Sequence, residues 1–194
     1  KASLSSRAIG NALYGFQDIT SDIEGVAELM EAITDKVRDF EGDLAGQDIG
    51  IGLYGLQGLS ADLPQVREFI GVFASKIEGS ESELDAQAMS NALYGLQSMS
   101  SEYPEVIHLV SSLATKVADS RPILNAQAIG SALYGLQKLD SDTLEVRSLL
   151  AAMVEKVESC EQGLDAKAVS TALFGLQRMK SNSAEVRALV QAIS

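Results

Sequence analysis

Hydrophobic residues recur at helical spacing along the chain. Within residues 84–123, Met89, Ala92, Leu93 and Leu96 occupy positions i, i+3, i+4 and i+7, the spacing of one buried helix face. A polar turn at residues 98–102 separates them from a second apolar stripe. That stripe consists of Val106, Leu109, Val110, Leu113 and Val117. The pattern predicts two helices joined by a short turn.

The same pattern occurs five times in the sequence, with a period of 40 residues. The segment Ala92-Leu93-Tyr94-Gly95-Leu96-Gln97 returns, with small changes, at residues 12–17, 52–57, 132–137 and 172–177. A fixed period of this length is typical of a repeat array, in which each unit buries its apolar face against its neighbours. The copies span residues 4–43, 44–83, 84–123, 124–163 and 164–194, and the last is cut short. We therefore expect a single all-α domain over residues 1–194, an α-solenoid with a right-handed superhelix of helix-turn-helix repeats, and we expect it to be part of a longer chain.

Several recurring polar residues mark the expected helix ends. Asp85 can cap the first helix of its copy, as can Ser5, Asn125 and Asp165 in the equivalent places. Pro64 and Pro104 suit the first turn of a second helix, where the missing N–H donor would be unpaired anyway. A lysine recurs near the end of the second helix, where a cation suits the negative pole of the helix dipole. These lysines are Lys36, Lys76, Lys116 and Lys156.

Besides apolar residues, a glycine and a glutamine recur unchanged in all five copies. A glycine follows the aromatic position, and we place it in the middle of the first helix, where it costs about 1 kcal/mol relative to alanine. Its recurrence indicates a close approach by a neighbouring helix. A glutamine follows two positions later, and we expect it to satisfy backbone groups at the junction between copies. These residues are Gly15, Gly55, Gly95, Gly135 and Gly175, and Gln17, Gln57, Gln97, Gln137 and Gln177.

Composition narrows the classes of function. The chain has 27 acidic and 15 basic side chains, a net charge of −12 that disfavours nonspecific binding to nucleic acid or to anionic membrane. One cysteine, Cys160, permits no internal disulfide. The apolar runs are too short to span a bilayer, so we expect no membrane insertion.

The sequence offers little for catalysis or for cofactor binding. Residues 50–55 spell GxGxxG, but the motif neither follows a strand nor opens a βαβ unit, so it does not indicate a dinucleotide site. His108 and Cys160 are the only residues of their types and lie in different copies. A nucleophile pair or a zinc site needs more convergent groups than these. We expect no enzyme activity, no metal and no cofactor.

A candidate ligand-binding stripe runs along one face of the first helices. In the third copy it contains Gln87, Asn91, Tyr94 and Ser98, spaced i, i+4, i+7 and i+11. Stripes from successive helices of a solenoid can line one concave groove. Two positions of the stripe vary between copies, and a third keeps an aromatic ring. For the aromatic ring we favour a role in packing over stacking against a ligand. The candidate residues are Asn11, Ile51, Asn91, Ser131 and Thr171; Asp18, Gly58, Ser98, Lys138 and Arg178; and Tyr14, Tyr54, Tyr94, Tyr134 and Phe174.

The charges separate along the same stripe. The first helices and the starts of the turns that follow them carry five basic and three acidic side chains, a net charge of +2, and the rest of the chain carries −14. The basic residues gather in the last two copies. A groove of this kind, with small hydrogen-bonding side chains that change from copy to copy, suits base-by-base reading of single-stranded RNA.

The first-helix sequence, as in residues 125–137, resembles the octotricopeptide repeat, whose first helix carries a Q-x-x-A-N-x-L-W-A-L-A pattern. Tyr103-Pro104-Glu105-Val106 is similar to the PPPEW-type start of its second helix. The resemblance covers the whole chain and implies helical hairpins that bind organellar RNA, and hence a plastid or mitochondrial location. The main alternative is a protein-binding scaffold or a structural subunit of a larger assembly. For that alternative we expect a partner on an outer row of second-helix residues, Arg67, Ile107 and Arg147, in which Ile107 is an apolar residue with no core to join.

Overall fold

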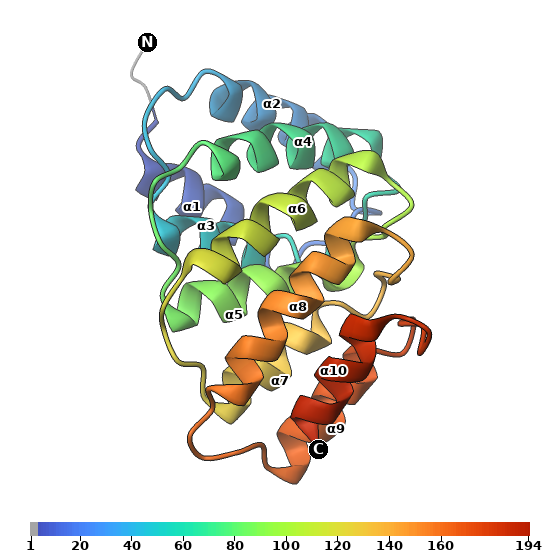
Figure 1. The fold of residues 1–194 in the computed structure, drawn as a ribbon. Helices are drawn as coiled ribbons and strands as arrows, with labels where there is room; N and C mark the ends of the chain where they lie inside the picture. Colours follow the sequence, from blue (N-terminus) through green and yellow to red (C-terminus); the bar gives the residue numbers. More distant parts are fainter. Residues whose placement is uncertain (1–3) are drawn as a thin grey trace.

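The computed structural model describes residues 4–194 and shows only helices and connecting turns in that range, with no strand (Figure 1). Each of the five sequence copies supplies two consecutive α-helices. In chain order they are α1 (Ser6–Tyr14), α2 (Val26–Arg38), α3 (Gly46–Gly55), α4 (Pro64–Glu78), α5 (Ala86–Tyr94), α6 (Pro104–Asp119), α7 (Ala126–Tyr134), α8 (Leu144–Glu158), α9 (Ala166–Gly175) and α10 (Ala184–Ile193). A short 3₁₀ helix, η1 (Gly95–Ser98), follows α5.

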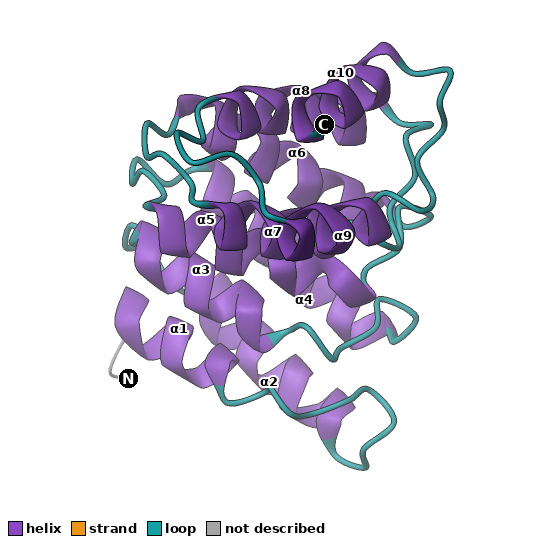
Figure 2. Ribbon diagram, turned by 90° about the horizontal axis from the view of Figure 1, so that it is seen from below, coloured by secondary structure: helices purple, strands orange, loops and turns teal. Residues whose placement is uncertain are grey.

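The helices form two layers. Each helix packs most closely against the helices two positions before and after it in the chain, so α1, α3, α5, α7 and α9 make one layer and the even-numbered helices make the other. Both views show the helices of each layer side by side in sequence order (Figures 1 and 2). The expected all-α architecture is confirmed, and the arrangement is consistent with an α-solenoid.

The predicted helix starts are confirmed. Ser5, Asp85, Asn125 and Asp165 each accept a hydrogen bond from the backbone N–H three residues later, which satisfies a free amide of the first turn. Pro64 and Pro104 open α4 and α6. Two further caps, Thr143 on α8 and Ser183 on α10, have the same geometry.

The core lies between the two layers and runs without a break through the copies. In the third copy Leu93 and Leu96, from the first apolar stripe, and Val106 and Leu109 on α6, from the second, are all fully buried members of this core. Both apolar stripes predicted from the sequence therefore face the core.

The invariant glycine lies at the end of the first helix, so its expected place in the middle of the helix is wrong. Gly15, Gly95 and Gly135 are the residues that directly follow α1, α5 and α7, and Gly55 and Gly175 are the last residues of α3 and α9. Beyond the glycine the backbone N–H groups donate to the carbonyl three residues earlier, as Leu56 does to Leu53 and Leu136 does to Leu133, and in the third copy this turn is the 3₁₀ helix η1. The turn therefore begins earlier than the hydrophobic pattern suggests.

The expected reason for the glycine, a close approach by a neighbouring helix, is confirmed. A β-carbon added at Gly55 or Gly95 would lie 2.1 Å from a leucine carbonyl oxygen of the preceding copy, and at Gly135 or Gly175 the distance is 1.9 Å. The backbone at these glycines has ordinary negative φ angles, so the need for glycine is steric. At Gly15 an added β-carbon meets only its own helix.

These contacts predict different outcomes for two equivalent substitutions. Gly135→Ala drives a β-carbon into the Leu93 carbonyl and should lower the free energy of unfolding by about 1 to 3 kcal/mol. Gly15→Ala, the matched control, should change it by less than about 0.5 kcal/mol. Urea denaturation followed by circular dichroism measures both, and equal losses would contradict the steric role of this position.

Candidate ligand-binding groove

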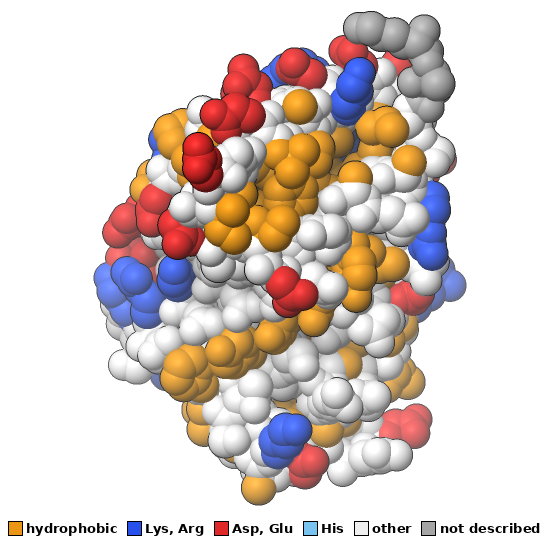
Figure 3. All heavy atoms as spheres, turned by 180° about the vertical axis from the view of Figure 1, so that it is seen from behind, with side chains coloured by type: hydrophobic (Ala, Val, Ile, Leu, Met, Phe, Trp, Pro, Cys, Tyr) orange, Lys and Arg blue, Asp and Glu red, His pale blue; other side chains and the backbone are white. Residues whose placement is uncertain are grey.

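The first candidate position of the stripe lies on the open side of the first-helix layer. Asn11 is exposed, and Ile51, Asn91, Ser131 and Thr171 are half-buried. Around Asn91 and Ser131 the surface is hollowed, with a volume of about 610 Å³. On the face seen in Figure 3, charged side chains lie mainly near the edges, and hydrophobic and uncharged polar side chains occupy most of the centre.

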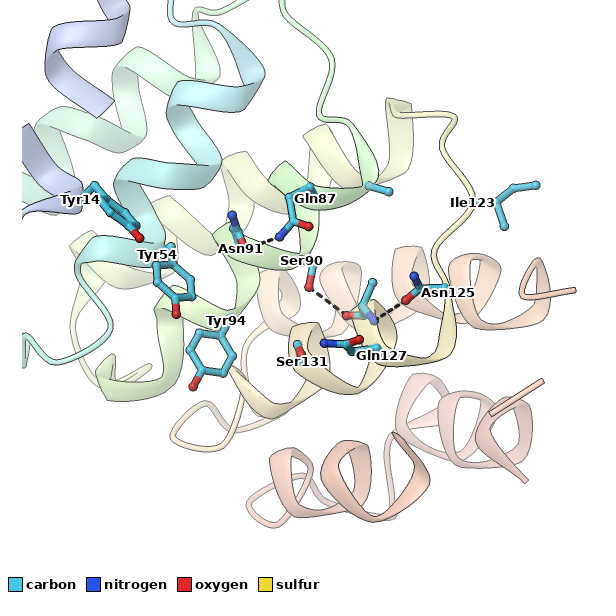
Figure 4. Close-up of a pocket in the computed structure, with 12 residues that line it drawn as sticks. Tyr14, Tyr54, Gln87, Ser90, Asn91, Tyr94, Ile123, Asn125, Gln127 and Ser131 are labelled. Atoms are coloured by element: carbon cyan, nitrogen blue, oxygen red, sulfur yellow. Dashed lines mark hydrogen bonds between the residues drawn. The ribbon is translucent and has the colours of Figure 1, made fainter. Parts of the chain in front are cut away.

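All twelve side chains that line this hollow are uncharged. They are Tyr14, Tyr54, Ala86, Gln87, Ser90, Asn91, Tyr94, Ile123, Asn125, Gln127, Ala128 and Ser131. Figure 4 shows Gln87, Asn91, Gln127 and Ser131 around the hollow beside the tyrosines. The amide and hydroxyl groups can donate and accept hydrogen bonds, and the lining offers no charge to pair with an ion.

Besides the helix cap at Asn125, two hydrogen bonds hold the polar lining in place. Gln87 Nε2 donates to Asn91 Oδ1 at 2.8 Å within α5. Ser90 Oγ donates to the backbone carbonyl of Ala128 at 3.1 Å and so links α5 to α7. Gln127 is exposed on α7 and remains available for a ligand.

The aromatic position forms a continuous ladder along the groove. The rings of Tyr14, Tyr54, Tyr94, Tyr134 and Phe174 stack in order, with centroids 5.5 to 6.1 Å apart and planes inclined by 15 to 24°. Figure 4 shows the first three rings one above another. The rings therefore pack against one another, and their contact with a ligand stays a prediction. Because neighbouring rings cover each other's faces inside the ladder, they present edges to the groove, and in the tyrosines a hydroxyl group as well.

The second variable position of the stripe, represented by Ser98 in the third copy, lies beyond the invariant glycine and outside the first α-helix. Ser98 is half-buried, and its hydroxyl donates to the Gln57 carbonyl at 2.6 Å, so it is committed to the junction between copies. Gly58 is also half-buried, and an added β-carbon there would lie 2.5 Å from the Ile19 carbonyl. Only Asp18, Lys138 and Arg178 are exposed at this position. The prediction that this second variable position shares one helical stripe with Asn91 is therefore wrong.

The N-terminal end of the groove contains an ion pair that the sequence analysis missed. Asp48 is buried on α3, where it accepts hydrogen bonds from Ser6 Oγ at 2.6 Å and Arg7 Nη1 at 3.2 Å, both on α1. A second hollow beside this pair is lined by Arg7, Asn11, Ile51 and Gln87, among others. Comparison of the copies could have revealed Asp48, because the four equivalent residues are alanines.

Three of the four lysines join successive copies, which we had not predicted. Each ammonium group donates to a backbone carbonyl 36 residues earlier, in the loop that ends the preceding copy. The pairs are Lys76 with Phe40, Lys116 with Ser80, and Lys156 with Ser120. Of the four lysines, only Lys36 is the exposed cation at a helix end that the dipole argument predicts.

Serine and glutamine side chains add two further links between copies. The hydroxyls of Ser21, Ser101 and Ser141, in the turn between the two helices, accept hydrogen bonds from backbone N–H groups of the following copy. Gln97 Nε2 donates to Gln57 Oε1 at 3.1 Å, which places the invariant glutamine at the junction as expected. Its partner there is the neighbouring glutamine rather than the backbone.

In the outer row of Arg67, Ile107 and Arg147, which we expected to bind a partner of a scaffold, the two arginines bind backbone carbonyls of the turns. Arg67 donates to the carbonyls of Ala61 and Asp62, and Arg147 makes the equivalent bonds in its own copy. Ile107 packs against the core, so the view that it has no core to join is wrong. Tyr103 donates its hydroxyl to Asp62 at 2.8 Å, and this bond lowers the pKa of the Asp62 carboxyl and raises that of the phenol.

Two observations bear on membrane and metal binding. No helix in residues 4–194 has the length and apolar character needed to cross a membrane. In the same residues, no group of three or more His, Cys, Asp or Glu side chains could hold a metal ion.

Comparison of the chain with protein-family models, with curated proteins and with solved structures gives no match. The resemblance to the octotricopeptide repeat thus depends on the repeat pattern alone.

The lysine contacts give a second matched pair of substitutions. Lys116→Met keeps the length of the side chain but removes its bonds to Ser80 and Ser82, and should lower the free energy of unfolding by about 1 to 3 kcal/mol. Lys36→Met removes an exposed lysine and should change it by less than about 0.5 kcal/mol. Chemical denaturation measures both values, and a loss at Lys36 as large as that at Lys116 would contradict the junction role.

Proposed function

We propose that the chain is a non-catalytic, right-handed solenoid of five units, and that its first-helix groove binds an extended segment of a partner protein. The observation that carries this proposal is the uncharged lining of the central hollow. A polypeptide backbone is neutral and alternates N–H donors with C=O acceptors, which asparagine and glutamine side chains can pair with simultaneously. A polyanion would need cations along the whole groove.

The ring ladder and the net charge support the same ligand class. Tyrosine edges and hydroxyls beside amide side chains provide large, rigid contact area with polar tips, a combination that is enriched in protein interfaces. The net charge of −12 lies on the second helices and loops, and it favours the long-range approach of a basic segment over an acidic one. We therefore infer a basic, extended peptide as the ligand.

A peptide selected from a random display library tests this proposal. Asn91→Ala combined with Gln127→Ala removes two amides from the hollow, and should weaken binding of the selected peptide by roughly tenfold to a hundredfold, since each hydrogen bond contributes about 1 kcal/mol. Ser148→Ala, on the exposed side of α8, is the control and should bind as the unaltered chain does. Failure to select any peptide, or equal binding by the groove variant, would overturn the proposal.

Single-stranded RNA is the second candidate, and one observation favours it. Lys138, Lys167 and Arg178 are exposed on the first-helix side of the last two copies and form no ion pair with residues 4–194. These cations could hold phosphates, while Asn91 and Ser131 read base edges. Lys180, close by, is paired with Asp142. Membership of the family that the chain resembles would add an organellar location.

Fluorescence anisotropy with a pool of random single-stranded RNA separates the two candidates. At about 50 mM salt, where phosphate contacts are least screened, RNA binding would be saturable, and Lys138→Ala with Arg178→Ala would weaken all sequences alike. Asn91→Ala would instead change which base is preferred. We expect no saturable binding, and a saturable RNA curve without peptide binding would replace our proposal with the RNA reading.

A further inference from the structure

The central hollow of the groove has an exposed isoleucine on its rim. Ile123 lies in the loop between α6 and α7, is 56% exposed and lines the hollow together with Ala86 and Ala128. Figure 4 shows Ile123 at the side of the hollow away from the tyrosines. These three side chains form an apolar corner beside the amide groups of the lining. An apolar ligand side chain that enters this corner leaves water, which favours binding.

The second hollow, of about 450 Å³, is the same space one copy earlier. Seven of its nine lining residues have an equivalent, 40 residues later, in the lining of the central hollow. The two hollows also share Tyr14, Gln87 and Asn91, so they are neighbouring parts of one groove. A ligand that extends along the groove therefore meets two equivalent spaces in succession.

Glu83 takes the place of Ile123 at the second hollow. It is exposed, and its carbonyl oxygen would lie 2.0 Å from a β-carbon added at Gly46. Gly46 directly precedes Gln47, which lines this hollow. The Glu83 carboxylate forms no ion pair with residues 4–194. A ligand cation in the second hollow would therefore find an unpaired acidic partner on the rim.

The charged residues in the lining of the second hollow agree with this preference. Arg7 is the only basic residue of that lining, and it is paired with the buried Asp48. Asp85 is the only acidic one, and it caps α5 through one of its two carboxylate oxygens. In the central hollow the equivalent of Asp85 is the uncharged Asn125.

The loops that carry Glu83 and Ile123 differ in charge as well. Residues 80–84, before α5, read SESEL, and Glu81 is exposed like Glu83. Residues 120–124, before α7, read SRPIL, so Arg121 replaces that acid and Pro122 fixes one backbone angle of the loop. Of the loops before α3, α5, α7 and α9, only the one before α7 has no acidic side chain. The central hollow therefore disfavours a basic side chain, whereas the second hollow attracts one.

We propose that the groove selects an extended peptide with a basic side chain in the second hollow, beside Glu83, and an apolar side chain in the central hollow, beside Ile123. This inference rests on the proposed function, because it requires a peptide in the groove. Packed helices lie roughly 8 to 10 Å apart and an extended chain advances about 3.3 Å per residue, so the two side chains should be about two or three residues apart.

Selection from a random peptide display library, carried out separately with the unaltered chain and with two loop variants, tests this inference. Peptides selected by the unaltered chain should share a lysine or arginine and, two or three residues away, an apolar residue. Arg121→Glu with Ile123→Glu copies the charges of the loop before α5, and should replace the apolar residue of the motif by a second basic one. Glu81→Arg with Glu83→Ile makes the opposite exchange, and should replace the basic residue by an apolar one. All four side chains are exposed, so both variants should fold, and circular dichroism checks this.

Anisotropy titrations with a labelled peptide selected by the unaltered chain measure the size of the effect. Replacement of its apolar residue by lysine should weaken binding to the unaltered chain by roughly tenfold, because the apolar contact is lost and Arg121 repels the new charge. The same replacement should strengthen binding to the variant with Arg121→Glu and Ile123→Glu. Glu155→Ile, at an exposed position of α8 in the other layer, is the control and should change neither the selected motif nor the affinity.

Two further outcomes separate this inference from the proposed function. If peptides bind but the unaltered chain and both loop variants select the same motif, the assignment of the two hollows is overturned and the proposed function stands. If no peptide is selected, or if the selected peptides bind equally well after Asn91→Ala with Gln127→Ala, the proposed function fails and this inference fails with it.

Discussion

The packing of a leucine carbonyl against a glycine of the next copy is the contact on which the other features depend. At 1.9 to 2.1 Å from the position of the missing β-carbon, the carbonyl leaves no room for any side chain at Gly55, Gly95, Gly135 or Gly175. This approach brings successive first helices close enough for their aromatic rings to stack. Glycine, a residue that weakens an isolated helix, thus determines the spacing of the whole first-helix layer.

Much of the architecture could be predicted because the apolar period and the 40-residue period are independent signals that agree. The caps at Asp85 and Asn125 and the prolines at Pro64 and Pro104 also act locally, so neighbouring sequence is sufficient to identify them. The early helix end at Gly95 was missed because the apolar spacing continues to Leu96, beyond the residue at which the helix stops. The approach of the Leu53 carbonyl to Gly95 also leaves no mark in the local hydrophobic pattern.

The sequence was sufficient to predict Asn91 and Ser131 as groove residues, because both lie on the first helices themselves. The prediction failed for Ser98 and Gly58, because the turn that follows the glycine places these residues in the junction between copies. The contacts of Lys76, Lys116 and Lys156 were missed for a related reason. A lysine near a helix end satisfies the dipole rule whether or not a carbonyl lies within its reach, so the pattern could not distinguish the two situations.

The links between copies also constrain how the gene can change. Lysine contacts join residues 36 positions apart, and the turn serines reach residues 39 positions ahead, so every link assumes the same copy length. An insertion or deletion of a few codons inside a helix would displace the residues beyond it relative to both neighbouring copies. Duplication or loss of one complete 40-residue copy would preserve every link. The array can therefore lengthen or shorten through recombination between copies, while the groove changes by single substitutions at positions such as Asn91.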